Sequence, residues 1–379
     1  MSLVFYDDSP VFGGHEVMTL LGLEAVLAAS PEPVHFLAAA ANPKLCQALA
    51  ALAARHPQLR LEPLAYHSSK LEAVRNQLQP SRCRRLARRL LELEPALVVA
   101  IQGNIEHSSL ALLAARRAAI PSTSYLPVPH SNAAMGARLG ALRDVFASRL
   151  FQLPDSFITI SDEMARLLRL RGATAPVHIV YNGVDTTRFQ PGDPVAACQH
   201  LGLPPDKPRL GMIGRIEFRQ KQQHLLVAAV AAEPALREAC HLVFAGAGPD
   251  VAALHALIAR HRIAATVLPW CDPAQLYQAL DALVIPSRYE GLPLVMLEAL
   301  ASGTAVLASD RDGMKDLLPP AWRVEPNSHS ALAAGLCRFL RDGCPKPAAA
   351  LVARVRESMS LAAFGRTFAT TVAALAGRA

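Results

Sequence analysis

The sequence lacks the features that would place a chain across a membrane or outside the cell. It contains no uncharged apolar run of roughly 18 residues, which excludes a membrane-spanning helix. The N-terminus passes from Leu3-Val4-Phe5-Tyr6 into two aspartates, without the basic region and apolar core of a secretory signal. We therefore expect a cytoplasmic protein, with peripheral association at the inner face of the cell membrane as an open alternative.

Cysteine pairs and aromatic residues are also scarce. The seven cysteines are odd in number and scattered, and no Cys-x-x-Cys pair or Cys/His cluster has the spacing of a metal site. They indicate reduced thiols used for packing, and we expect no metal and no cofactor. Aromatic residues make up only 5% of the chain. Stacking platforms for nucleic-acid bases are therefore not expected, although the net charge of +7 suits phosphate-bearing ligands.

What the sequence does have is a regular alternation of apolar strands and helical stretches. At 379 residues, with 52% hydrophobic residues, it exceeds the usual size of a single core. Such alternation predicts parallel sheets covered by helices, here as two Rossmann-like domains joined near residues 186–207, where turn residues cluster. The predicted strands are Leu3–Tyr6, Val34–Ala38, Leu59–Leu61, Leu97–Ile101, Ser124–Leu126 and Phe157–Ile160, then Leu210–Ile213, Leu242–Ala245, Thr266–Leu268, Ala282–Ile285 and Thr304–Leu307.

The stretch 281–303 carries the clearest functional signal. The buried strand Ala282–Ile285 is followed by a loop at its carboxyl end, where ligands bind in open α/β sheets. The next helix, residues 293–302, is apolar nearly all round, yet it contains Glu298. A buried carboxylate needs a hydrogen-bond donor, and Glu290 lies in the preceding loop. Either the two glutamates bind a ligand, or Glu298 is tied to a structural donor and Glu290 faces solvent.

Cations and glycines follow other predicted strands. Arg215 leaves the end of one strand and Lys221 lies near the next helix, so together they could complement a diphosphate; the alternative is a basic surface loop. Gly13-Gly14 stands at a strand-to-helix turn, where backbone NH groups can approach a phosphate, or it is simply a tight turn. His130 follows another strand. The acidic pair Asp310 and Asp312 lacks a third ligand, so we do not expect a metal there.

Residues 70–93 carry an arginine-rich helix with an apolar stripe of Leu86, Leu90 and Leu93. A basic amphipathic helix can lie on an anionic membrane. The alternative is a solvated helix whose leucines pack on the domain core, and nucleic-acid binding ranks last because aromatic residues are missing. The arginines are Arg75, Arg82, Arg84, Arg85, Arg88 and Arg89.

Taken together, these residues resemble the GT-B-fold retaining glycosyltransferases of family 4, which use nucleotide-sugar donors. The resemblance runs almost the whole chain. Its most specific parts are the Arg215/Lys221 spacing and the Glu290/Glu298 pair, in that order. It also includes Gly13-Gly14 with Glu16, His130, Ser161, Asn182-Gly183-Val184-Asp185, Arg188-Phe189 and Gly246-Ala247-Gly248-Pro249.

The resemblance implies a GT-B fold with two Rossmann-like domains facing a central cleft. Residues 1–188 would form the acceptor-side domain and 189–358 the donor domain, and a C-terminal helix in 359–379 would return to the first domain. Arg215 and Lys221 would bind the donor diphosphate, and Glu298 the ribose. Other implied contacts are Glu290, Gly291 and Leu292 with the sugar or phosphate, Gly13 and Gly14 with the diphosphate, His130 with the sugar, and residues 268–271 with the base.

The sequence departs from the family pattern at two positions. Pro293 stands where many members have a second glycine, so the backbone contacts of that loop with the sugar are open. His15 replaces a usually small residue in the first loop and is expected to narrow the donor or acceptor entrance.

The resulting prediction is a retaining glycosyltransferase. It would move a hexose or N-acetylhexosamine from a nucleotide-sugar, a UDP-sugar being favoured, to a glycan or polyprenyl-linked acceptor in cell-surface polysaccharide or glycolipid synthesis. No divalent metal is required. Two alternatives stay open: a nucleotide-sugar epimerase or hydrolase of the same fold, and a non-catalytic nucleotide-sugar-binding subunit.

Overall fold

The computed structural model describes residues 2–69 and 71–377. These residues form two compact units. The first contains the chain up to Gly183 together with the residues from Leu361 onward, and the second is Val184–Ser360. The predicted boundaries lay after residues 188 and 358. Residues 184–188 belong with the second unit because the Val184 N–H donates to the Met359 carbonyl (2.8 Å) and Arg356 donates to the Thr186 carbonyl (3.0 Å).

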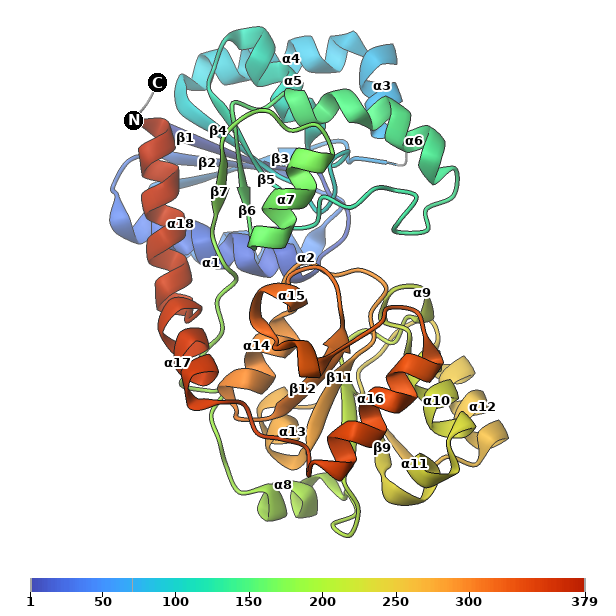
Figure 1. Ribbon diagram of the computed structural model, residues 1–379. Coiled ribbons are helices and arrows are strands. Elements are labelled where there is room, and N and C mark those ends of the chain that lie inside the picture. The colour runs from blue at the N-terminus through green and yellow to red at the C-terminus, as the bar shows by residue number, and fades with distance from the viewer. Residues whose placement is uncertain (1, 70, 378–379) are drawn as a thin grey trace. The chain divides into compact units, whose positions relative to one another are not determined.

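The first unit is built on a parallel sheet of seven described strands in the order β3-β2-β1-β4-β5-β6-β7 (Figure 1). The central strands β1, β2 and β4 are buried almost throughout because both faces of the sheet are covered. The strands are β1 (Ser2–Asp7), β2 (Val34–Ala39), β3 (Leu59–Leu64), β4 (Pro95–Ile101), β5 (Ser122–Tyr125), β6 (Ser156–Thr159) and β7 (Val177–Ile179). β7 was not predicted, since a strand of three residues is too short to show a recognisable pattern.

Helices cover both faces of this sheet. α4 and α5 lie over one face, and α1 and α2 lie over the other, where α18 packs along α1 (Figure 1). The predicted return of the C-terminal helix to the first domain is therefore confirmed. The helices are α1 (Gly14–Ala29), α2 (Pro43–Arg55), α3 (Glu72–Leu78), α4 (Pro80–Leu93), α5 (Ser109–Ala118), α6 (Gly140–Ala147), the 3-10 turn η1 (Ser148–Gln152), α7 (Asp162–Leu170) and α18 (Leu361–Ala376).

The second unit repeats the scheme with six described strands in the order β10-β9-β8-β11-β12-β13. All of its pairs are parallel, which confirms the prediction of two parallel α/β sheets. The strands are β8 (Arg209–Ile213), β9 (His241–Ala245), β10 (Ala265–Leu268), β11 (Ala282–Ile285), β12 (Ala305–Ser309) and β13 (Arg323–Val324). Topologically, the chain reverses direction across the sheet between β8 and β11, and such switch points open a crevice for ligands.

The helices of the second unit again form two layers. α10 packs against α12 and α16, whereas α13 packs against α8 and α14. The helices are α8 (Pro194–Leu201), α9 (Phe218–Lys221), α10 (Gln223–Ala232), α11 (Pro234–Ala239), α12 (Val251–His261), α13 (Pro273–Ala279), α14 (Leu294–Ala301), α15 (Met314–Leu317), the 3-10 turn η2 (Pro320–Trp322), α16 (His329–Arg341) and α17 (Ala349–Ser358).

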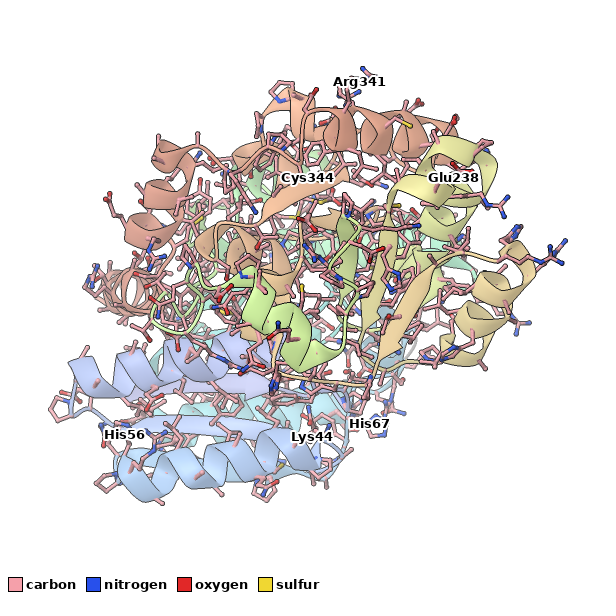
Figure 2. All side chains as sticks on the ribbon, turned by 90° about the horizontal axis from the view of Figure 1, so that it is seen from below. Lys44, His56, His67, Glu238, Arg341 and Cys344 are labelled. Carbon is pink, nitrogen blue, oxygen red and sulfur yellow. The ribbon has the colours of Figure 1, made fainter. Side chains whose placement is uncertain are left out.

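Two expectations from composition can be compared with the described side chains, which Figure 2 draws. No disulfide joins the cysteines within residues 2–69 and 71–377, and Cys344, labelled in that view, is buried in the second unit. None of the helices in this part of the chain has the length and apolarity needed to cross a bilayer.

Candidate functional site

Three loops of the second unit meet at the carboxyl ends of neighbouring strands β8, β11 and β12. The loop after β11 is held by the loop after β8, since the Arg288 N–H donates to the Gln220 carbonyl (2.7 Å) and the Gln220 side chain donates to the Tyr289 carbonyl (3.3 Å). It is also held by the loop after β12, because the Gly313 N–H donates to the Gly291 carbonyl (2.9 Å). The predicted ligand loop is therefore fixed from both sides.

Lys221 and Glu290 form an ion pair in this group of loops. Lys221 Nζ donates to Glu290 Oε1 at 2.6 Å, and the Glu290 side chain is only 8% exposed. Glu290 therefore does not face solvent, and the structure brings together two residues predicted separately. The remaining lone pairs of the Glu290 carboxylate can accept hydrogen bonds from hydroxyl groups.

Asp312 holds the backbone of this site. Its Oδ2 accepts the Glu290 N–H at 2.8 Å, and Asp312 is a non-glycine residue with a left-handed φ of 53°. Such a conformation costs of order 1 kcal/mol and is kept only where contacts fix it. Asp310 points elsewhere, to Arg323 (2.6 Å). The two aspartates thus hold different groups, and they do not form an acidic pair for a cation.

Arg215 offers the most accessible cation of the site. Its side chain is 62% exposed, with Nε 3.4 Å from Glu217 Oε2. Its backbone is held in place, because the Gln223 side chain donates to the Arg215 carbonyl (2.9 Å). A weakly paired guanidinium on a fixed backbone can turn towards an incoming anion at little cost.

Glu298 on α14 has a partner within the protein. The Tyr277 hydroxyl donates to Glu298 Oε2 at 2.7 Å, so no ligand is needed to satisfy that oxygen. The sequence predicted that Glu298 needs a donor and left open whether a ligand or the protein supplies it; Tyr277 on α13 supplies one. Burial raises the pKa of the Glu298 carboxyl, while the Tyr277 hydrogen bond and the nearby charge of Arg188 act in the opposite direction.

Ser287 is a candidate that sequence reasoning missed. A small pocket at this edge is lined by Lys221, Gln223 and Ser287. The Ser287 hydroxyl is fully buried and has no hydrogen-bond partner among the described atoms, and Gln223 Oε1 is in the same situation. The signal in the sequence was a polar residue directly after the strand-ending Pro286. Buried unsatisfied polar atoms in a pocket are typical of places where a ligand or water binds.

In the first unit, the Gly13-Gly14 turn is organised by Glu16. Glu16 Oε2 accepts the Gly13 N–H at 2.6 Å, and Glu16 Oε1 pairs with His15 Nε2 at 2.9 Å. Asp7 lies beside them, and burial raises its pKa to about 7. Ligand atoms of Asp7, His15 and Glu16 lie within 4.8 Å of one another. Apart from the His15–Glu16 ion pair, Asp7 Oδ2, His15 Nε2 and Glu16 Oε1 are buried and make no hydrogen bond to the described atoms.

His15 has a structural explanation for its size. A Cβ on Gly103 would lie 2.6 Å from the His15 ring, so the ring packs directly on a backbone that only glycine permits. Gly14 is exposed, and His130 is buried in the loop that follows β5. These residues all belong to the first unit, whereas Arg215, Lys221, Glu290, Gly291, Leu292 and Glu298 belong to the second.

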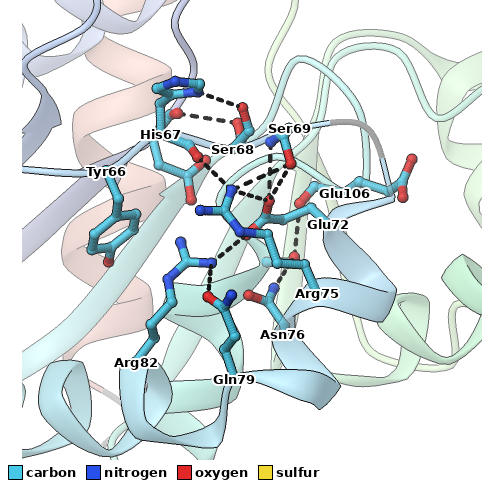
Figure 3. A network of polar contacts seen from close by, with 12 residues as sticks. Tyr66, His67, Ser68, Ser69, Glu72, Arg75, Asn76, Gln79, Arg82 and Glu106 are labelled. Carbon is cyan, nitrogen blue, oxygen red and sulfur yellow. Dashed lines mark hydrogen bonds and ion pairs between the residues drawn. The ribbon is translucent and has the colours of Figure 1, made fainter.

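The arginine-rich helix α4 differs from the amphipathic membrane helix that its sequence suggested. Leu86 and Leu90 pack in the core of the first unit, so the apolar stripe is not free. Arg82 is buried and donates to Glu72 (3.2 Å), which also accepts from Arg75 (3.3 Å), as Figure 3 shows.

Glu62 pairs with a third arginine of the group. Arg89 forms a two-pronged pair with the Glu62 carboxylate, at 2.9 and 2.7 Å. Arg84, Arg85 and Arg88 are the members of the arginine group that remain exposed. α4 is therefore mainly a structural helix, as the alternative interpretation held.

Comparisons with known proteins agree with this geometry. The profile described as "Glycosyltransferase Family 4" matches residues 23–188, and the one described as "Glycosyl transferases group 1" matches residues 207–342. The D-inositol 3-phosphate glycosyltransferase 2 of Catenulispora acidiphila is 38% identical over 176 residues, which are 42% of this chain and 41% of that protein. The chain thus spans about two fifths of the length of the curated relatives it matches.

Solved structures share the whole architecture. HepE of Anabaena, solved with UDP, superposes with a TM-score of 0.78 at 19% identity, covering 99% of this chain and 100% of HepE. Sucrose-phosphate synthase of Thermosynechococcus elongatus superposes with a TM-score of 0.76 at 19% identity, covering all of both chains. At such identities the likeness establishes the GT-B fold. With the two profiles on its two halves, the chain belongs to the group 1, family 4 glycosyltransferases.

Proposed function

We propose that this protein is a retaining glycosyltransferase that moves a hexose or N-acetylhexosamine from a UDP-sugar to a hydroxyl of a glycan or lipid-linked acceptor. The observation that carries the proposal is the Lys221–Glu290 pair beside the exposed Arg215, at the carboxyl ends of β8 and β11. HepE, which has the same fold, has been solved with UDP and with UDP-glucose. A role in cell-surface polysaccharide or glycolipid synthesis is part of the proposal.

The chemistry requires stabilisation of negative charge. As the acceptor oxygen bonds to the anomeric carbon, the bond from that carbon to the diphosphate breaks, and the electron pair stays on the diphosphate. The acceptor hydroxyl attacks from the face that the diphosphate leaves, so the anomeric configuration is retained without an enzyme nucleophile. Its proton passes to a phosphate oxygen, so no enzyme base is needed. Arg215 and Lys221 would stabilise the leaving group, and groups placed in this way each contribute about 10²–10³ in rate. No divalent metal takes part in this scheme.

The glutamates would recognise the donor. Because Lys221 balances its charge, Glu290 can accept hydrogen bonds from sugar hydroxyls without repelling the diphosphate strongly. Glu298 would use Oε1 for a ribose hydroxyl while Oε2 remains with Tyr277. Backbone groups of Gly291 and Leu292 would contact sugar or phosphate. For Gly13 and Gly14 of the first unit we propose diphosphate contacts, and for His130 a place beside the sugar.

A donor panel tests the proposal. UDP-, GDP- and ADP-sugars are compared by thermal shift, followed by product analysis with and without an acceptor mixture, in EDTA and in Mg²⁺. We expect UDP-sugars to raise the melting temperature most, and transfer to persist in EDTA. Conversion of the donor without an acceptor would favour an epimerase or hydrolase instead. Binding without turnover on any acceptor would favour an accessory subunit, and no response to any nucleotide-sugar would overturn the donor site.

A further inference from the structure

α6 in the first unit is an inverted surface helix. A helix on a globular core normally turns its apolar residues inward. Here the charged residues face inward: Arg143 pairs with Glu106, and Asp144 pairs with Arg171 (3.0 Å). The apolar residues face outward, with Leu139 60%, Leu142 50%, Val145 68% and Phe146 40% exposed. Spaced by three and four residues, they form one continuous face.

Within residues 131–152, the exposed charged residues are arginines. Between residues 131 and 152 the sole acidic residue is Asp144, and its side chain is 14% exposed and paired. Arg138 and Arg149 stand exposed just before and after the helix. We call Leu139, Leu142, Val145 and Phe146, with Arg138 and Arg149, the α6 face. Contiguous exposed apolar residues mark an interaction site, and a cationic rim adds attraction to an anionic partner.

We propose that the α6 face binds the surface of an anionic lipid bilayer. Its apolar residues would enter the interfacial region, and the two arginines would meet lipid phosphates. A short helix with apolar residues on one side and a cationic rim matches that interface. α4 fits it less well, because its Leu86 and Leu90 are used in the protein core and three of the six arginines predicted for the membrane are paired.

The position of α6 gives this contact a consequence for the acceptor, which rests on the proposed function. Asp144 accepts the backbone N–H groups of Asn132 (2.8 Å) and Ala133 (3.1 Å), and so ties α6 to the loop that carries His130. Docking of α6 would therefore bring the His130 loop close to the bilayer. An acceptor hydroxyl carried on a membrane lipid would be presented there.

The test is co-sedimentation of the full chain with phosphatidylcholine vesicles, with and without phosphatidylglycerol, in the absence of donor. The Leu142→Asp/Val145→Asp variant is compared with Leu170→Asp/Val195→Asp. This control removes the same two side-chain types and adds the same charge at sites that are 69% and 61% exposed outside the α6 face. We expect the first variant to lose at least roughly tenfold in binding to anionic vesicles and the control to match wild type.

Two charge variants separate α6 from α4. Arg138→Gln/Arg149→Gln removes the rim of the α6 face and needs no change in packing, so it remains informative if the aspartate variant folds poorly. Each arginine lost should weaken binding to anionic vesicles roughly fivefold. Arg84→Gln/Arg85→Gln/Arg88→Gln removes the exposed charges of α4, and we expect the smaller effect per residue because no apolar face accompanies them.

Several outcomes would overturn the proposal. Wild type that stays in the supernatant with anionic vesicles, equal loss in the Leu142/Val145 variant and its control, or a loss confined to the α4 variant would each do so. A concentration-dependent dimer that the Leu142/Val145 variant abolishes would show that a second copy covers this face. Because vesicle binding is measured without donor, and UDP-sugar binding by thermal shift, failure of one leaves the other standing.

Discussion

The strand ends of the two units use charge in opposite ways. In the first unit, carboxylates are buried at or near the end of β1 and bind groups of the same unit: Asp8 accepts the Ser108 N–H at 2.8 Å, and Glu16 accepts the Gly13 N–H and pairs with His15. Burial raises the pKa of Asp8 to about 6. In the second unit the corresponding loops carry cations. The Arg215 side chain is exposed, and Lys221 pairs with one glutamate, Glu290.

The difference separates a scaffold from a binding site. The carboxylates of the first unit accept hydrogen bonds from backbone N–H groups and so shape a glycine turn, which makes their role structural. The cations of the second unit have donor capacity left, because Arg has five N–H groups and Lys three. An anion therefore gains most by binding at the strand ends of the second unit, and the following variants test this contrast.

The largest effect is expected for Lys221→Ala. Removing the cation that balances Glu290 and the leaving diphosphate should lower the rate of sugar transfer by about 10²–10³. The measurement is kcat and KM on the donor identified by the panel, with Lys315→Ala as a control that removes an exposed lysine of the same unit.

A double variant separates catalysis from folding in this prediction. Lys221→Met leaves Glu290 buried without its partner, and adding Glu290→Gln removes that charge. The double variant should recover thermal stability while transfer stays low. Wild-type rates in Lys221→Ala would contradict the assignment of the diphosphate site.

A smaller effect is expected at Glu298. If its Oε1 binds the ribose, Glu298→Ala should weaken UDP binding about 10–100-fold, the range for a hydrogen bond to a charged group. Tyr277→Phe keeps the carboxylate and removes only its protein partner, so UDP affinity should change little while the melting temperature falls. Isothermal titration of UDP against both variants checks this. Equal losses of affinity would identify Glu298 and Tyr277 as a structural pair.

The smallest effect concerns the first unit and pH. Asp7 titrates at about 7 in the folded protein and near 3.8 when unfolded, so the folded state holds the extra proton between these values. The stabilisation from Asp7 is complete below the unfolded pKa and is lost as pH rises towards 7, by about 1 kcal/mol for each pH unit.

Asp7→Asn imitates the protonated form and should flatten that loss. Urea unfolding at several pH values between 4 and 8 measures it, with the exposed Asp206→Asn as the control for removing a charge. Parallel pH profiles of wild type and Asp7→Asn would show that the burial of Asp7 does not govern stability.

Much of the fold followed from local pattern. Continuous apolar runs bounded by turn residues located the strands of both sheets to within a few residues, because strands covered on both faces have no polar side. Ser161, which precedes two acidic residues, has the sequence pattern of a helix N-cap, and its hydroxyl accepts the Met164 N–H at 3.2 Å. β7 and β13 escaped, since three and two residues carry too little pattern.

The partners of the charged residues did not follow from the sequence. That Lys221 meets Glu290, that Tyr277 satisfies Glu298 and that Asp312 holds the Glu290 N–H all depend on loops and helices far apart in the chain. The spacing of these residues predicted a site at the strand ends, but it could not predict which residues hydrogen-bond to each other within that site. The same limit applies to α4, because the sequence could not show that two of its arginines pair with Glu62 and Glu72.

The sequence by itself thus determined two parallel α/β domains and the strand ends that carry polar residues, because both depend on short-range periodicity. Only the tertiary structure decided which charged side chains pair within the protein and which can still bind a ligand. A residue's cost of burial and its partners are set by neighbours distant in sequence. For that reason an apolar face is turned outward on α6, whereas Leu86 and Leu90 of the arginine-rich helix, for which the sequence left both interpretations open, pack in the core.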